Sequence, residues 1–164
     1  MEAIDRYIER LSEPAVRSYW RAINHIDEQG PGPDDGSKAS DEQVNLAEKE
    51  LGVALPLSYR KLVTTTEPYD GVYGVYWVVE SGRLGADLVS TRLSPHSPLP
   101  PSLIAVVGDD SGDEYCFDTR HPGDRGEYPI VHFEHEVHDE ESTEFETVAE
   151  DLGEFLLASL GGET

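Results

Sequence analysis

The spacing of apolar residues changes along the chain, and that change most constrains the fold. Residues 2–28 carry apolar side chains at every third or fourth position, as one face of a helix requires. Helical spacing continues over 39–63, whereas 72–79 and 103–137 are rich in β-branched and aromatic residues, which favour strands. Helical spacing returns over 151–160. Helices, then strands, then one helix predict an α+β fold, with an antiparallel sheet packed against N-terminal helices and one C-terminal helix.

Local signals indicate where the predicted helices begin and end. Pro14 interrupts the first helical pattern, so either two helices meet there or one helix kinks. Ser40 and Gln43 have the spacing of a capping box, and the helix that follows is expected to end at Gly52 in the left-handed conformation. Asp151 is expected to cap the last helix.

The strand candidates differ in the strength of their signal. The apolar run 103–107 is typical of a buried strand, and the turn 109–113 is expected to join it to a strand over 114–118 as a hairpin. Residues 128–137 predict a further strand. Residues 88–93 are a weaker strand candidate.

Length and composition predict one domain. The 164 residues of the chain fall within the range of about 100–200 that is usual for a domain. We expect a single unit over 1–164, with an N-terminal helix and a flexible connector over 1–38 and the domain core over 39–160. The lone Cys116 allows no internal disulfide. Without a long apolar run or a basic N-terminal region, the chain is expected to be cytoplasmic.

The charge of the chain indicates which classes of partner to expect. Asp and Glu number 34 against 12 Lys and Arg, which gives a formal net charge of −22 at pH 7. A field of this sign repels phosphate, so it argues against nucleic acid and anionic membranes as partners. It attracts a basic protein and speeds the encounter with one. Two plainer explanations stay open, because acid also keeps a protein in solution and is abundant in salt-loving hosts.

Acidic residues gather in the turn 109–114 and in the segment from Glu134 to Asp151, and those of the second segment are expected to project from one end of the sheet. Between Glu134 and Asp151 there are nine acidic residues and no Lys or Arg. A charge run of this kind is either a docking surface or a solvated loop. As the partner-binding residues we predict Asp109, Asp110, Asp113, Glu114, Glu134, Glu136, Asp139, Glu140 and Glu141.

The sequence offers weak signals for catalysis or metal binding. His132, His135 and His138 are spaced by three, and on a strand His132 and His138 are expected to share a face with Glu134 and Glu136. His135 to His138 is one residue too short for the zinc motif His-Glu-x-x-His. The acidic turn does not match a calcium loop, and no glycine-rich phosphate loop is present. We therefore expect no enzyme activity, no cofactor and no metal, with a metal-dependent hydrolase that uses His132 and His138 kept as an alternative.

Residues 39–62 resemble the start of a SUKH superfamily domain. A helix that ends in Leu51-Gly52 is followed by Leu55-Pro56 and then by Tyr59-Arg60, as in that family. Later segments resemble the family in the same order: Ile104 to Asp118, Tyr128 to Glu136, and Asp151 to Leu156.

The resemblance implies an α+β domain that binds proteins. In bacteria many members of the superfamily are immunity proteins, which bind and neutralise a toxin, often a nuclease. The resemblance therefore implies a protein partner, a cognate toxin that is expected to be basic. A regulatory protein-binding scaffold, as in the eukaryotic relatives, is the alternative.

Overall fold

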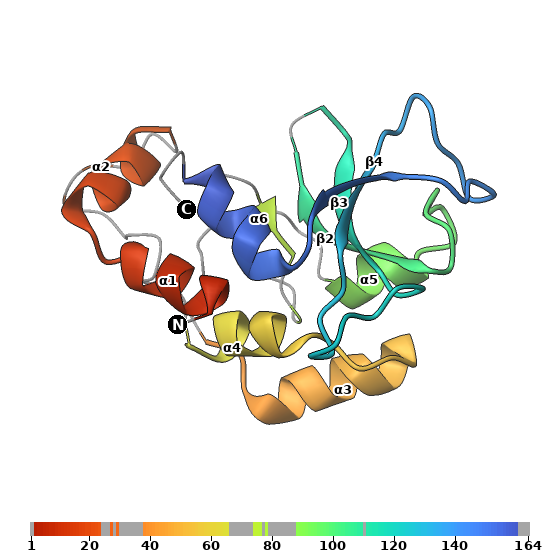
Figure 1. The fold of residues 1–164 in the computed structure, drawn as a ribbon, viewed down its shortest axis with the longest axis horizontal. Coiled ribbons are helices and arrows are strands. Elements are labelled where there is room, and N and C mark those ends of the chain that lie inside the picture. The colour runs from red at the N-terminus through yellow and green to blue at the C-terminus, as the bar shows by residue number, and fades with distance from the viewer. Residues whose placement is uncertain are drawn as a thin grey trace.

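The computed structural model has helices, then most of its strands, then one helix along the chain (Figure 1). It describes residues 2–23, 27, 29, 38–65, 74–76, 78, 88–109 and 111–160. The helices are α1 (Ala3–Arg10), α2 (Pro14–Ile23), α3 (Asp41–Leu51), α4 (Leu57–Thr65), α5 (Leu88–Leu93) and α6 (Leu152–Ser159). The strands are β1 (Gly74–Val75), β2 (Leu103–Gly108), β3 (Glu114–Asp118), β4 (Ile130–Phe133) and β5 (Glu146–Ala149).

The strands form one five-stranded antiparallel sheet in the order β1-β2-β3-β4-β5. Ile104 lies opposite Phe117, and Phe117 lies opposite Ile130. The β2–β3 pair confirms the predicted hairpin. Helices at the N-terminal side of the chain and one C-terminal helix accompany this sheet, which confirms the predicted α+β class.

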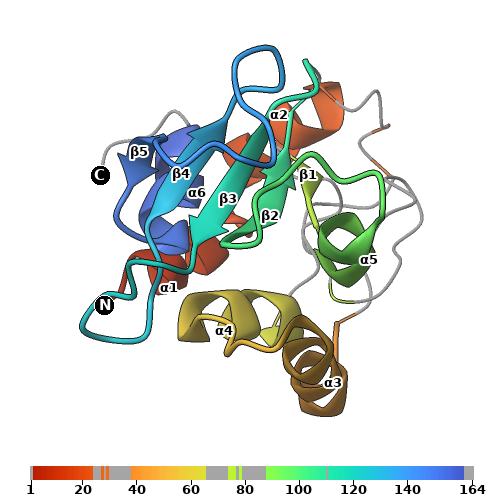
Figure 2. The same ribbon diagram turned by 90° about the vertical axis from the view of Figure 1, so that its right-hand side faces the viewer.

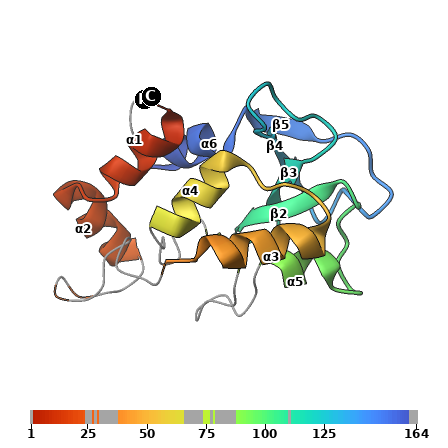
Figure 3. The same cartoon turned by 90° about the horizontal axis from the view of Figure 1, so that it is seen from below.

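Hydrophobic side chains are buried on both faces of the sheet. On one face, Ile104, Phe117 and Ile130 belong to the same core as side chains of α1, α4 and α6. Figures 1 and 3 show these three helices gathered on one side of the sheet. A second core lies on the other face and consists of Leu99, Leu103, Ala105, Cys116, Val131 and Phe133.

The predicted helix ends are confirmed. The Ser40 hydroxyl accepts a hydrogen bond from the Gln43 N–H at 3.2 Å, and the Gln43 side chain accepts one from the Ser40 N–H at 2.9 Å. Gly52 ends α3 with a φ of 76°, which is the left-handed conformation. The Asp151 carboxylate accepts from the Glu154 N–H at 2.8 Å and so caps α6.

The N-terminal helical pattern forms two helices rather than one kinked helix. Pro14 is the first residue of α2, where the absence of an N–H costs no helical hydrogen bond. In the described segments, no helix is both long and apolar enough to cross a membrane.

The strand predicted over 88–93 is wrong, because these residues form α5. Leu88 and Val89 are buried in the main core, and the Arg92 guanidinium donates to the Pro101 carbonyl at 2.8 Å. Tertiary packing overrides the weak β-propensity of this short segment.

The strand predicted over 128–137 is too long. β4 covers only Ile130–Phe133, because the chain turns at Glu134. The Glu134 carbonyl accepts from the N–H groups of Val137 and His138 at 3.0 and 2.8 Å. The histidines at 135 and 138 therefore lie in a turn, where the alternation of a strand does not apply.

Replacing Gly153 with alanine is expected to destabilise the fold, although alanine favours helices. A Cβ at Gly153 would lie 2.4 Å from the Ile4 nitrogen, so α6 and α1 would have to separate. Overpacking of this kind lowers the free energy of unfolding by about 1–3 kcal/mol. Urea unfolding measures the change, with Glu154→Ala on the exposed side of α6 as the control, expected within about 0.5 kcal/mol of the parent. A stabilised Gly153→Ala variant would contradict the close approach of the two helices.

Candidate protein-binding surface

Two acidic loops lie at the same end of the sheet. One is the β2–β3 turn, and the other connects β4 to β5 over residues 134–145. Figure 2 shows the two loops near each other at the top of the sheet, with α3 and α4 at the opposite end. This follows from the antiparallel pairing of β2, β3 and β4. β2 and β4 run in the same direction, so the loops that follow them leave the sheet at the same end.

Asp113 links the two loops. Its Oδ2 atom lies 2.9 Å from Nε2 of His132, and its Oδ1 atom lies 2.6 Å from Nδ1 of His135. Oδ1 also accepts from the His135 N–H at 3.0 Å. The hydrogen bond with His135 lowers the pKa of the Asp113 carboxyl and raises the pKa of the His135 imidazole. Each group therefore favours the charged form of the other.

His132 on β4 connects Asp113 to the hydrophobic core. The ring of His132 stacks on Tyr115, with ring centroids 4.9 Å apart and an interplanar angle of 13°. The ring of Tyr115 in turn packs against the ring of Phe155 in α6, with ring centroids 4.9 Å apart. The loops are thus held by a chain of contacts that reaches the C-terminal helix.

Asp109 shapes the β2–β3 turn. Its Oδ1 atom accepts from the Ser111 N–H at 2.8 Å, from the Ser111 hydroxyl at 2.6 Å and from the Asp113 N–H at 3.1 Å. Gly112 follows with a φ of 94°, which disfavours any residue with a side chain. This carboxylate therefore organises the backbone that carries Asp113.

An ion pair fixes the base of the β4–β5 loop. Asp118 is buried with 2% of its surface exposed, and Arg120 binds both of its carboxylate oxygens at 2.9 Å. Burial by itself would raise the pKa of Asp118, but the hydrogen bonds of Arg120 hold it below its usual value. The same guanidinium donates to the Thr143 carbonyl at 2.7 Å and lies 5.6 Å from the ring centroid of Phe145.

The predicted partner-binding residues divide into three groups. Glu136, Asp139, Glu140 and Glu141 are exposed, and Glu134 is partly exposed. Asp109 and Asp113 are partly buried and brace the loops. Glu114 is half-buried and accepts from the Tyr76 hydroxyl, while Asp110 lies outside the described residues. We call the acidic end the set Asp109, Asp113, Glu134, Glu136, Asp139, Glu140 and Glu141.

A hollow of about 290 Å³ joins the two loops into one surface. It is lined by Ser111 and Asp113 from one loop and by Glu134, His135 and Val137 from the other, together with Glu136. Val137 leaves 70% of its surface exposed, so an apolar contact point sits among the acids.

The expectation that His132 and His138 share a face is wrong. The turn at Glu134 separates them: His132 contacts Asp113, whereas Nδ1 of His138 accepts from the Glu134 N–H at 2.9 Å. His135, whose role the spacing argument missed, joins His132 at Asp113 because the chain reverses between them.

Within the part of the chain that the structure describes, one group of side chains has the spacing of metal ligands. Asp109, Asp113 and His132 each offer an atom within 4.8 Å of the others. Both oxygens of Asp113 and Oδ1 of Asp109 already accept hydrogen bonds from the turn and the imidazoles. Their closeness is therefore explained by hydrogen bonding, with no cation required.

Glu114 has the most perturbed carboxyl among the predicted residues. Its Oε1 atom accepts from the Tyr76 hydroxyl at 2.9 Å, whereas Oε2 is buried and has no hydrogen-bond partner among the described residues. Burial raises the pKa of Glu114 to about 7, and the charges of Asp109 and Asp113 act in the same direction. Leaving a buried acceptor unpaired costs about 1–3 kcal/mol.

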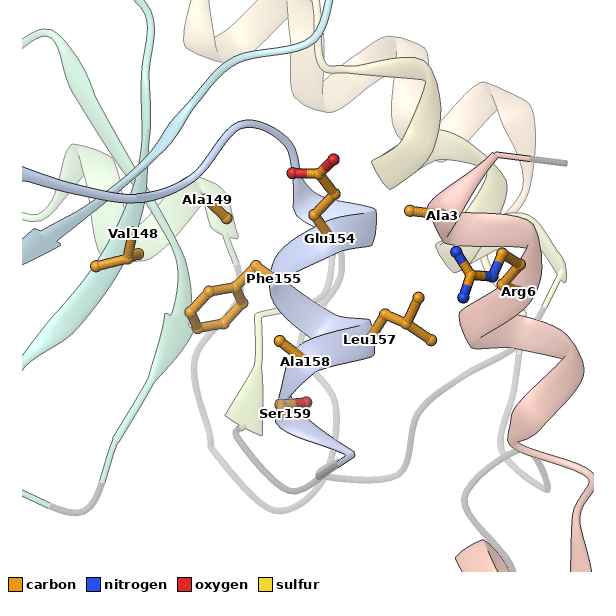
Figure 4. Close-up of a pocket in the computed structure, with 9 residues that line it drawn as sticks. All are labelled: Ala3, Arg6, Val148, Ala149, Glu154, Phe155, Leu157, Ala158 and Ser159. Atoms are coloured by element: carbon orange, nitrogen blue, oxygen red, sulfur yellow. The ribbon is translucent and has the colours of Figure 1, made fainter. Parts of the chain in front are cut away.

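A separate pocket of about 560 Å³ lies between α1, β5 and α6 (Figure 4). Arg6 and Glu154 are the ionisable residues that line it, and apolar side chains such as Phe155 and Leu157 form much of the rest. We place the candidate site at the acidic end instead, because several charged groups converge there.

Replacing Glu114 with glutamine is expected to stabilise the protein above neutral pH. A carboxyl whose folded pKa is raised from 4.5 to about 7 stabilises the fold fully below pH 4.5, and this contribution is lost as the pH rises through 7. Glutamine never ionises, so Glu114→Gln gains about 1–2 kcal/mol over the parent at pH 8, a figure reduced for partial exposure, and little at pH 4.5. Urea unfolding at a series of pH values measures the difference. Exposed Glu140→Gln is the control, and a pH-independent difference for Glu114→Gln would contradict the burial of its charge.

Comparison with known proteins identifies the family. No curated protein matches the chain. The family model described as SMI1 / KNR4 family (SUKH-1) matches residues 38–158, a span that runs from just before α3 to the last turn of α6. The match covers most of the chain, and the fold agrees with the α+β domain that the sequence resemblance implied. The chain therefore belongs to the SMI1 / KNR4 family (SUKH-1).

Proposed function

We propose that this protein is an immunity protein that binds a cognate basic toxin through the acidic end and thereby neutralises it. The observation that carries the proposal is a cluster of exposed carboxylates on the β4–β5 loop, which Asp113 joins to the β2–β3 turn, with no Lys or Arg from Glu134 to Asp151. Membership of the SUKH family supports a role in protein–protein interaction.

The arrangement of the charge supports docking more strongly than its amount. Glu136, Asp139, Glu140 and Glu141 are exposed on one loop, so their fields add on the same side of the molecule. The loop turns are internally bonded: Asp139 Oδ1 accepts from the Glu141 N–H at 2.9 Å, and the Ser142 hydroxyl accepts from the Asp139 N–H at 2.9 Å. A loop ordered before binding loses little conformational entropy when a partner docks.

The proposed mechanism is occlusion. Nucleases bind polyanionic substrates with basic surfaces, so a rigid row of carboxylates competes for the same surface. Neutralisation then requires no bond to be made or broken, and we propose that the protein acts without catalysis. Long-range attraction raises the association rate, and the apolar Val137 and the ordered turns slow dissociation.

Coexpression tests the biological role. We expect the gene to lie beside a toxin gene, and the chain to restore growth of cells that express that toxin and to copurify with it untagged. A regulatory scaffold of the same family would bind a host enzyme and leave the toxicity unchanged, so absence of protection against the neighbouring toxin would contradict immunity.

Neutralising the exposed acids tests the surface. The variant with Glu134, Glu136, Glu140 and Glu141 changed to Gln and Asp139 to Asn is expected to bind the toxin at least about 100-fold more weakly, with the larger part of the loss in the association rate at low salt. Surface plasmon resonance at several salt concentrations measures both rates. A control that changes Glu9, Glu13, Glu42, Glu50 and Asp124 has the same net charge and is expected to lose less than about tenfold. Equal losses in the two variants would show that only total charge matters.

A further inference from the structure

Glu114 leaves one buried carboxylate oxygen unsatisfied by the described residues. The Tyr76 hydroxyl occupies Oε1, and the Tyr76 carbonyl accepts from the Tyr59 hydroxyl at 2.7 Å, which fixes the position of that residue. Gly108 makes room for the contact, since a Cβ there would lie 2.6 Å from the Tyr76 hydroxyl oxygen. Oε2 has no donor among the residues that the structure describes. Native proteins pair most buried acceptors, so a carboxylate with one unpaired oxygen is stabilised by a cation bound nearby.

The same glutamate lines a pocket of about 450 Å³. The pocket lies where α5 and the segment 94–99 face β3 and β4, and it combines an apolar floor with a few polar groups. Leu99 and Phe133 are buried members of the second core, and no Lys or Arg is among the described residues that line the pocket. Its lining consists of Thr91, Ser94, His96, Ser97, Pro98, Leu99, Gly112, Glu114 and Phe133.

We propose that this pocket binds the guanidinium group of an arginine side chain, with Glu114 as the counter-charge and the hydroxyls of the pocket as further acceptors. The identity of this occupant rests on the proposed function, because the basic partner supplies the arginine. Gly112 lines the pocket and belongs to the β2–β3 turn, so the pocket lies next to the acidic end. A partner docked on the acidic end therefore has its side chains within reach of the pocket.

The chemistry of the pocket favours arginine over lysine. A guanidinium group is weakly hydrated and presents several N–H donors in a plane, whereas an ammonium group holds its water strongly. The walls offered by Pro98, Leu99 and Phe133 are apolar, and a planar cation packs against such walls at lower cost than a compact one. Buried arginines of this kind are frequent centres of binding energy in protein interfaces.

A titration with n-butylguanidinium at pH 8, where Glu114 with its pKa of about 7 is ionised, tests the pocket without the toxin. We expect saturable NMR shifts of Leu99, Gly112 and Phe133 in the intact chain, with a dissociation constant on the order of millimolar for so small a probe. Neutral n-butylurea and n-butylammonium are expected to bind at least about tenfold more weakly. Glu114→Gln and the pocket-filling Thr91→Leu are expected to lose at least about tenfold in guanidinium affinity, while Glu42→Gln on α3 is expected to match the parent within about twofold.

The result that overturns the inference is distinct from the one that overturns the immunity proposal. Shifts spread over 134–141 and equal in Glu114→Gln would show that the probe only samples the acidic end, and the pocket would be rejected. Toxin binding that is weakened by the five acidic changes but unaffected by Glu114→Gln and Thr91→Leu would likewise reject the pocket and leave the docking surface in place. Normal amide spectra for both variants establish that they are folded.

Discussion

The burial of β2 on both faces is the constraint on which the arrangement depends. Leu103 to Val107 are all buried, with their side chains divided between the two cores. Helices cover one face of the sheet, while Leu99 and Phe145 pack on the other. A sheet covered on both faces offers a partner its ends and its edges, which is where the loops lie. At one end of the sheet, the Glu127 carboxylate accepts hydrogen bonds from the N–H and the hydroxyl of Ser58 in α4. At the other end the carboxylates face outward.

Concentrating negative charge in two loops carries a cost in self-repulsion, and the structure offsets it with internal donors. Asp113 is bonded by two imidazoles and a backbone amide, and Asp109 by one hydroxyl and two amides. Arg120 fixes the far side of the longer loop through Asp118 and Thr143. Hydrogen bonds that involve a charged group are roughly twice as strong as neutral ones, so a few of them hold several repelling carboxylates in place. Among the exposed acids, Asp139 also orders the loop, since its Oδ1 atom accepts from the Glu141 N–H.

The sequence predicted best those features whose physical cause is local. Ser40 and Gln43, Gly52 and Asp151 define helix ends through hydrogen bonds between residues within a few positions, and the structure confirms each one. The order of helices and strands follows from periodicity, so the α+β class was predictable as well.

Features set by contacts distant in sequence were not predictable. Residues 88–93 form a helix because Leu88 and Val89 reach the core, which their own composition does not indicate. His132 and His135 both bond to Asp113 because the chain turns at Glu134. The residue pattern predicted a continuous strand there instead. Glu114 looked like one more exposed acid until its contact with Tyr76, 38 positions away, removed it from that group.

The position of Cys116 gives the molecule a built-in probe of its own opening motions. The thiol is fully buried at the centre of β3, and burial raises its pKa well above the usual value. Thiolate chemistry at this sulfur is therefore suppressed while the second core stays closed. Since it is the only thiol in the chain, alkylation kinetics would report how often the middle of the sheet becomes accessible, and whether an occupied loop surface slows that event.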